Sequence, residues 1–144
     1  MQERTSNVEI RLLSTGDAAV LEHVADDVFD EPIDRDRLAA YLSSPDHFMI
    51  VAVADGVVVG QCAAVIHRHP DKPTELYLDE VGVAAQFRRR GIARRMVDAM
   101  FALGKAAGCA EAWVGTEYHN AAARRLYEGF GVSSEPFVMY VFGL

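Results

Sequence analysis

One stretch of about twenty residues constrains this chain more than any other. Residues 76–83 (LYLDEVGV) are typical of a β-strand, residues 84–87 of a short loop, and residues 88–93 (RRRGIA) of a glycine-containing turn that opens a helix. Five of the eight residues from Arg88 to Arg95 are arginine. A helix N-terminus presents unpaired N–H groups and the positive end of the helix dipole, and Gly91 has no β-carbon to obstruct a bulky anion. The sequence therefore predicts an anion-binding turn, suited to the pyrophosphate of a nucleotide-like cofactor, rather than a merely solvated basic turn.

The composition limits the partners that such a turn can serve. The chain has 144 residues, 51% of them apolar, which suits one folded domain over residues 1–144. Its formal net charge of −7 disfavours nucleic acid and suits a cationic substrate. No apolar run is long enough to span a bilayer, and Met1–Asn7 lacks the apolar region of a secretion signal. We therefore expect a cytoplasmic protein with no membrane partner.

The cysteines and histidines show no spacing typical of a metal site. Cys62 and Cys109 are the only cysteines, and we expect both to be small buried thiols, neither bridged nor nucleophilic. His67, His69 and His119 form no recognisable ligand set. The sequence predicts no metal cofactor.

Alternating apolar and polar stretches predict a mixed α/β fold. Asp55-Gly56 lies between two runs rich in β-branched residues, which is a strong hairpin signal. Val20, Leu21, Val24 and Val28 recur at helical spacing, with Thr15 or Asp17 as the candidate cap. We predict strands at residues 8–13, 48–53, 57–66, 74–83, 110–115 and 137–142, and helices at 17–28, 34–42, 92–107 and 120–128.

The order of these elements sets the topology. A helix between the fourth and fifth strands requires a crossover connection, so these two strands should run parallel. The earlier hairpins pair antiparallel. The sequence therefore predicts a mixed, mostly antiparallel central sheet with helices on both faces.

Two motifs resemble the signatures of a known family. Residues 88–93 match the pattern Arg/Gln-x-x-Gly-x-Gly/Ala, and residues 120–131 contain Asn120, Ala123, Leu126-Tyr127 and Gly131 at a second characteristic spacing. In this order of elements they resemble the GNAT superfamily of N-acetyltransferases over nearly the whole chain. The resemblance implies acetyl-coenzyme A as cofactor, a sheet splayed between its fourth and fifth strands, and a possible homodimer. It implies cofactor contacts from Val81, Val83, Arg88, Arg89, Arg90, Gly91, Ile92, Ala93, Asn120, Ala123 and Tyr127.

Shorter matches resemble the GNAT-type aminoglycoside 3-N-acetyltransferases. They include residues 29–32 (FDEP), residues 75–77 (ELY), Glu80 and residues 114–118. The chain departs from that subgroup at residues 119–122 and at Asp79, beside the expected acceptor pocket. The resemblance implies a small-molecule amine substrate, the 3-amino group of an aminoglycoside; another amine, or a non-catalytic acyl-coenzyme A sensor, is the alternative. It implies substrate contacts from Phe29, Asp30, Glu31, Asp79, Glu80, Glu117 and Tyr118.

Direct acetylation of an amine needs a group that accepts its proton. An amine with a pKa of ~10.4 costs roughly 4.6 kcal/mol to deprotonate at neutral pH, and a nearby carboxylate can take the proton directly or through water. Asp79 and Glu80 would point to opposite faces of a regular strand, unless a bulge re-aims one of them. The resemblance favours Glu80 as the base, with Asp79 as the alternate; both could instead be solvated charges at a strand end.

The reaction also needs a stabilised oxyanion and a proton for the departing thiolate. Backbone N–H groups between Val81 and Val83 are the candidates for the oxyanion. Tyr127 is the candidate acid, since a phenol near ~10 and a thiol near ~8.5 have similar pKa values. Tyr127 could instead be a core aromatic on an amphipathic helix, and Asn120 could be only an N-cap.

Overall fold

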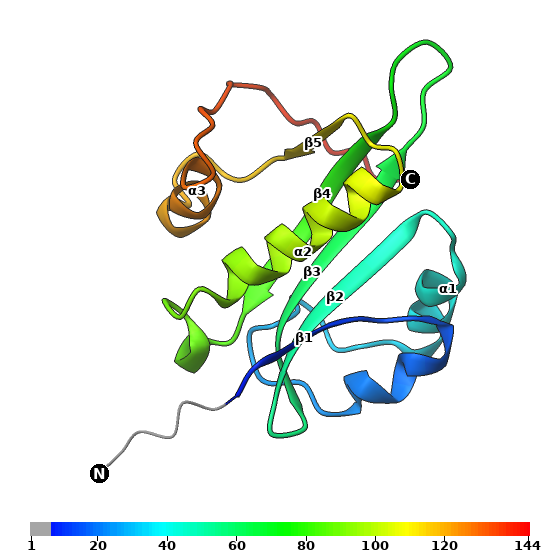
Figure 1. The fold of residues 1–144 in the computed structure, drawn as a ribbon, viewed down its shortest axis with the longest axis vertical. Helices are drawn as coiled ribbons and strands as arrows, with labels where there is room; N and C mark the ends of the chain where they lie inside the picture. Colours follow the sequence, from blue (N-terminus) through cyan, green and yellow to red (C-terminus); the bar gives the residue numbers. More distant parts are fainter. Residues whose placement is uncertain (1–6) are drawn as a thin grey trace.

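A five-stranded sheet forms the centre of the computed structural model, which describes residues 7–144 (Figure 1). The spatial order of its strands is the order of the chain, from β1 at one edge to β5 at the other. The strands are β1 (Glu9–Leu12), β2 (His47–Ala54), β3 (Val57–His67), β4 (Glu75–Val83) and β5 (Glu111–Val114). The other elements are the 3₁₀ helices η1 (Thr15–Glu22) and η2 (Ala85–Phe87) and the α-helices α1 (Arg35–Ser43), α2 (Ile92–Ala106) and α3 (Ala121–Glu128).

Strand directions follow the predicted topology. Neighbours from β1 to β4 are antiparallel, whereas β4 and β5 are parallel because α2 connects them. Asp55 (φ 50°) and Gly56 (φ 77°) join β2 to β3, and two successive positive φ angles are what a tight hairpin turn requires. The predicted mixed, mostly antiparallel sheet is therefore confirmed.

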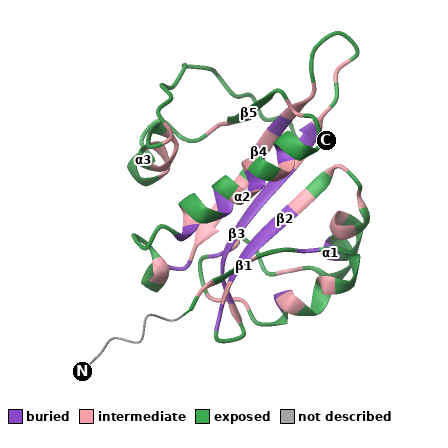
Figure 2. Ribbon diagram, viewed as in Figure 1, coloured by how far each residue is buried: buried purple, intermediate pink, exposed green. Residues whose placement is uncertain are grey.

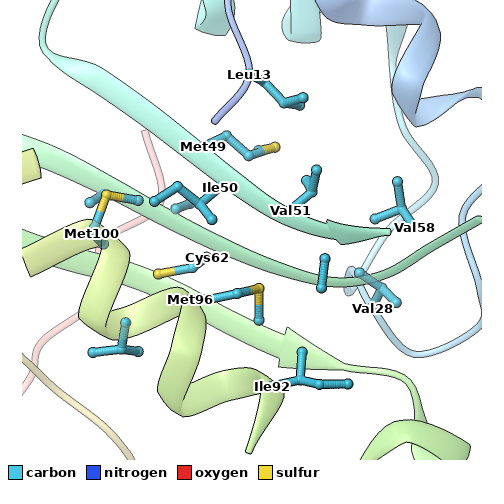
Figure 3. Packing of buried hydrophobic residues seen from close by; sticks show 14 of the residues in the cluster. Leu13, Val28, Met49, Ile50, Val51, Val58, Cys62, Ile92, Met96 and Met100 are labelled. Atoms are coloured by element: carbon cyan, nitrogen blue, oxygen red, sulfur yellow. The ribbon is translucent and has the colours of Figure 1, made fainter. Parts of the chain in front are cut away.

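The core lies on both faces of the sheet. Met96 and Met100 of α2 pack on the face to which Cys62 points, while Met49 and Leu13 lie on the opposite face (Figure 3). Buried positions concentrate in β2, β3, the first half of β4 and the inner side of α2 (Figure 2). None of the described helices is long and apolar enough to cross a membrane.

The first predicted helix is wrong in type and length. The structure has the 3₁₀ helix η1 in place of an α-helix over 17–28, and Ser14, not Thr15 or Asp17, is its N-cap. Asp17 accepts hydrogen bonds from the backbone N–H and hydroxyl of Ser14 at 2.8 and 2.9 Å, which fixes the start. Val24 then forms an isolated bridge with Val58. Pairing with β3 therefore outweighs the helical spacing of the apolar residues.

The predicted last strand is also wrong. Residues 137–142 belong to an extended tail, residues 132–144, that has no regular secondary structure. A strand needs a hydrogen-bonded neighbour, and within residues 7–144 the structure pairs β5 with β4 alone. The tail lies exposed in Figure 2.

Candidate active site

A bulge in β4 opens the candidate site. Ala63 of β3 pairs with Glu80 and Ala64 pairs with Leu78, so Asp79 is an extra residue in β4. The pairing of β4 with β5 ends at Leu78, opposite Val114. The strands therefore separate at the bulge, and the expected splay between the fourth and fifth strands is confirmed.

A large cleft occupies this separation. Its volume is about 1490 Å³. The walls come from the second half of β4, the turn into α2, the end of β5, α3, and the loop before α1. Its charged lining residues are Asp27, Asp30, Asp79, Glu80 and Glu117 among the acids, and Arg88, Arg89, Arg94 and Arg125 among the bases.

The start of α2 provides the cationic wall. Gly91 is its N-cap with φ 74° and has no side chain with which to cap, so the first N–H groups of the helix are available to a ligand. A β-carbon on Gly91 would meet nothing within 4 Å, so this side of the turn is open. Arg88 and Arg89 also line the cleft. A pyrophosphate fits this donor set because N–H groups, a helix dipole and two guanidinium groups all favour anions.

Several residues of the turn also make structural contacts. Arg88 is held by a 3.0 Å hydrogen bond from Nε to the carbonyl oxygen of Val83. The guanidinium of Arg90 lies 5.1 Å from the centre of the Phe87 ring, and Arg90 is not part of the cleft lining. Ile92 is buried beneath the turn, and Ala93 lines the cleft.

The end of β4 directs backbone groups into the cleft. Ala84 N–H donates to the carbonyl of Val59 at 2.8 Å, which places Ala84 in a hydrogen-bonded pair with β3. Because such pairs alternate along an antiparallel ladder, Gly82 bonds to β3, while Val81 and Val83 direct their N–H groups to the other side. On that side β5 has already separated. These N–H groups can donate to a ligand in the cleft.

Carboxylates gather around the bulge. Glu80 is half-buried, and its pKa is raised first by burial and then by the negative charges of Asp30 and Asp79. Both bulge residues line the cleft, as the sequence prediction required of the base and its alternate. A carboxyl group with a raised pKa is a stronger proton acceptor, so Glu80 is the better placed of the two for general-base work.

Gln61 fixes the loop that carries Asp27 and Asp30. This side chain is fully buried in β3, and its Nε2 donates to the carbonyl oxygen of Val28 at 3.3 Å. A β-carbon on residue 82 would clash with this same carbonyl oxygen of Val28, so only glycine fits at Gly82. The prediction missed Asp27, Val28 and Gln61. A glutamine in an otherwise apolar strand was the one available signal for Gln61.

Helix α3 forms the opposite wall. Asn120 caps it by accepting a 3.1 Å hydrogen bond from Ala123 N–H, and both residues line the cleft. The cap uses the carbonyl oxygen, so the amide NH₂ is the group of Asn120 that can contact a ligand. Burial raises the pKa of Tyr127 to about 12, so its phenol carries a proton throughout the physiological range.

Cys62 itself is a poor nucleophile. It is fully buried, and burial raises the pKa of its thiol to about 12. Because the thiolate is the reactive form, this environment disfavours an acyl-enzyme on Cys62. Among the described residues, no group of three or more histidine, cysteine, aspartate or glutamate side chains could hold a metal ion.

Several predicted substrate contacts lie at the margin of the cleft or outside it. Phe29 packs against the core and Glu31 is exposed, and neither is part of the cleft lining. Glu117 lines the cleft and pairs with His119 at 3.0 Å. Tyr118 is 86% exposed and belongs to a separate hollow of about 370 Å³ on α3. Of the seven predicted substrate contacts, four therefore line the cleft: Asp30, Asp79, Glu80 and Glu117. Phe29, Glu31 and Tyr118 do not.

Known proteins share this sequence pattern. The family model described as "Acetyltransferase (GNAT) family" matches residues 18–132. Among curated proteins, the Aminoglycoside N(6')-acetyltransferase type 1 of Salmonella typhimurium is 28% identical over 123 residues, which cover 82% of this chain and 77% of that protein.

Solved structures share the fold. An aminoglycoside acetyltransferase from an uncultured soil metagenomic sample, in complex with sisomicin, has a TM-score of 0.80 at 19% identity and covers 95% of this chain and 96% of that one. AAC(6')-Iy with the bisubstrate analogue CoA-S-monomethyl-acetylneamine has a TM-score of 0.79 at 23% identity, covering 96% of this chain and 99% of that one. The ribosomal-protein-alanine N-acetyltransferase of Brucella melitensis has a TM-score of 0.71 at 18% identity, covering 96% of this chain and 99% of that one.

Proposed function

Since this chain belongs to the acetyltransferase (GNAT) family, we propose that it transfers the acetyl group of acetyl-coenzyme A to an amino group of an aminoglycoside. The chain is an acetyl-coenzyme A-dependent N-acetyltransferase, and the proposal concerns its acceptor. One observation carries it. A single cleft joins a wall that favours a phosphate-bearing cofactor to a cluster of carboxylates that favours a polycationic amine.

The cationic wall would hold the cofactor. The helix N-terminus at Gly91, with Arg88 and Arg89, would bind the pyrophosphate, and Asn120 and Ala123 would flank the pantetheine arm. When bound, acetyl-coenzyme A supplies the thioester carbonyl that the amine attacks and the thiolate that leaves. The N–H groups of Val81 and Val83, which face the cleft, would donate to the thioester carbonyl oxygen.

Glu80 would accept the proton of the acceptor ammonium group. The raised pKa of Glu80 lies closer to the pKa of the amine than that of an ordinary glutamate does, which favours this transfer. Asp30 and Asp79 would hold the cationic acceptor beside it. Asp79 is the alternate base, because the bulge places both carboxylates on the cleft.

Tyr127 would supply the proton to the departing sulfur. Its phenol is protonated, and Tyr127 lines the cleft from α3. Tyr127→Phe should lower kcat with little change in the KM for acetyl-coenzyme A, because only a proton is removed. A near wild-type kcat for this variant would exclude Tyr127 as the acid.

The position of the acetylated amine is open to a direct test. The sequence predicted the 3-amino group, whereas the curated relatives are named N(6')-acetyltransferases. We take the 6'-amino group as the acceptor on the strength of that similarity. An aminoglycoside with a hydroxyl in place of the 6'-amine should then give no product, while acetylation of its 3-amine would restore the original prediction.

A panel of acceptors tests the whole proposal. Thiol release from acetyl-coenzyme A is measured with sisomicin and neamine, a polyamine, glucosamine 6-phosphate and a peptide with an N-terminal alanine. Aminoglycosides should give the highest kcat/KM. Preference for the polyamine, sugar phosphate or peptide would assign another acceptor, and cofactor binding without turnover on any amine would favour an acyl-coenzyme A sensor.

Homodimer formation completes the proposal. The family resemblance implies it, and the exposed apolar side chains of residues 137–142, together with the edge strand β5, are a surface that could carry it.

A further inference from the structure

Helix α3, which carries Tyr127, is anchored to α2 at its C-terminal end. No residue of α3 is fully buried, and the large cleft lies between this helix and the second half of β4. Arg94, in the first turn of α2, contacts Gly129 and Phe130, the two residues that follow α3 (Figure 1). The position of Tyr127 at the cleft therefore depends on how this end of the helix is held.

The Arg94 guanidinium makes this contact in two ways. Its Nη1 donates to the carbonyl oxygen of Gly129 at 3.0 Å, and its central carbon lies 3.6 Å from the centre of the Phe130 ring. Gly129 is the C-cap of α3, and the last carbonyl groups of a helix have no partner within it. A cation at this end also interacts favourably with the helix dipole. Arg94 therefore caps α3 from the neighbouring helix, and its planar group suits both contacts at once.

Phe130 is held from a second side by the same helix. Its ring centre lies 5.4 Å from that of Phe101, with the ring planes at 66°. Arg94 and Phe101 are seven residues apart on α2, which places them on one face of the helix and about 10 Å apart. Phe130 therefore lies between them. Its N–H donates to the carbonyl oxygen of Tyr127 at 3.1 Å, so the held residue is linked directly to the backbone of Tyr127.

The place of Arg94 on α2 needs an explanation of this kind. The helix dipole disfavours a cation in the first turn of a helix, and α2 has no acidic residue in that turn to offset it. The ion pair of Arg94 with Asp98 is 3.5 Å long and joins side chains that are 45% and 58% exposed, and such pairs contribute little. The contacts with Gly129 and Phe130 can offset this cost. Because Arg94 also lines the cleft, a contact with the cofactor is the alternative role.

We propose that Arg94 is a positioning residue for acetyl transfer, which holds the end of α3, through Gly129 and Phe130, where Tyr127 can protonate the departing sulfur. This inference rests on the proposed role of Tyr127 as the acid. A misplacement of about 1 Å can cost roughly two orders of magnitude in rate, so a side chain remote from the reacting atoms can determine kcat. Arg94 itself contacts neither the thioester nor the amine.

The Arg94→Met variant tests the proposal, because methionine has neither the charge nor the donors of arginine. The side chain of Arg94 is 45% exposed, so the variant should fold. We expect kcat to fall by roughly tenfold or more, with less than about a twofold change in the KM for acetyl-coenzyme A. In the Tyr127→Phe background the same substitution should lower kcat by less than about twofold, because its effect passes through Tyr127. A raised KM with an unchanged kcat would make Arg94 a cofactor contact, and equal losses of kcat in both backgrounds would refute positioning through Tyr127.

Two matched variants complete the comparison. Arg95→Met changes the next arginine of α2, whose Nη2 donates to the carbonyl oxygen of Val8 at 3.1 Å, and it should leave kcat unchanged. Arg94→Lys keeps the charge but not the planar group that stacks on Phe130, so it should restore only part of the lost activity. Full recovery of kcat in Arg94→Lys, or an equal loss in Arg95→Met, would overturn the proposal.

Hydrogen exchange separates this inference from the proposed function. The amides of residues 125–131, at the end of α3, should exchange about tenfold faster or more in Arg94→Met than in the wild type, while those of α2 should not change. Unchanged exchange at the end of α3 would overturn the role of Arg94 as its anchor, independently of what Tyr127 does. Faster exchange together with a near wild-type kcat for Tyr127→Phe would refute the proposed acid, and with it the catalytic consequence of the anchor, but not the anchor itself.

Discussion

Glu80 illustrates a conflict between stability and activity at one residue. A carboxyl group whose pKa is raised in the folded state stabilises the fold only when it is protonated, and that contribution is lost as the pH rises through the folded pKa. Near neutral pH the ionised Glu80 is therefore unfavourable for folding, because it is half-buried beside Asp30 and Asp79. The same ionised form is the one that can accept a proton.

The Glu80→Gln variant should thus have a lower catalytic rate and a higher unfolding temperature than the wild type near neutral pH. Removing the base should lower kcat/KM by roughly 10²–10⁴-fold. The midpoint of thermal unfolding should rise at pH 7, and the difference from wild type should vanish in acid, below the ordinary glutamate pKa of ~4.3. Asp79→Asn is the comparison, and it should lose less activity. Equal or greater loss in Asp79→Asn would make Asp79 the base.

Asp30 should influence the pH at which kcat/KM rises on the acid side of the profile. Its negative charge is the second cause, after burial, of the raised Glu80 pKa. Asp30→Asn should therefore lower that pKa and move the acid limb of the kcat/KM profile to lower pH. Glu31→Gln, one residue along the same loop, is the control, because Glu31 is not among the groups that shift Glu80. Parallel shifts in both variants would refute the specific role of Asp30.

At the scale of elements, local signals determined most of the fold. Asp55-Gly56 specified its hairpin, Asp34 caps α1 by accepting from Arg37 N–H at 2.9 Å, and Gly91 starts α2. The two wrong predictions, the helix over 17–28 and the strand over 137–142, concern segments whose conformation depends on a neighbouring element. Val24 forms an isolated parallel bridge with Val58 of β3, and no strand among residues 7–144 pairs with the tail. Neither fact is visible in the local sequence pattern.

The candidate site likewise has one part that the local sequence predicts and one part that depends on contacts between distant residues. The glycine-containing turn at the start of α2 was predictable because its features reside in consecutive residues. The acidic half depends on long-range packing: Gln61 lies 33 residues after Val28, and the bulge at Asp79 depends on the register against β3. The acids of the loop before α1 were therefore only partly identified.

Gln61 should position this loop without touching the acceptor. Backbone bonds tie one end of the loop to β3, from Val58 N–H to His23 and from Ala25 N–H to Val58, and Gln61 holds the carbonyl of Val28. Gln61→Leu removes that donor at a cost of about 1–3 kcal/mol in unfolding free energy. The KM for the amine should rise several-fold while the KM for acetyl-coenzyme A stays constant. A change in both KM values would indicate general loosening of the sheet.

At the scale of the whole molecule, charge is distributed unevenly. The chain carries 21 acidic and 14 basic side chains, yet five of the arginines fall between Arg88 and Arg95. The excess of acid elsewhere leaves a negative field around the amine end of the cleft, to which Asp27, Asp30, Asp79, Glu80 and Glu117 contribute. A cationic acceptor is thus attracted before it makes any contact.

This field predicts how the KM of the acceptor depends on salt. Exposed charges are screened over about 10 Å at 0.1 M ionic strength and about 3 Å at 1 M, so added salt should weaken acceptor binding much more than it slows the reaction of the bound complex. The KM for an aminoglycoside should rise with ionic strength, more steeply for acceptors with more ammonium groups, while kcat changes little. Steady-state kinetics from 0.05 to 0.5 M potassium chloride, with acetyl-coenzyme A saturating at each concentration, provide the measurement. A KM slope that is independent of the number of ammonium groups would mean that the carboxylates of the cleft act one at a time, through Glu80 alone, and not as a collective field.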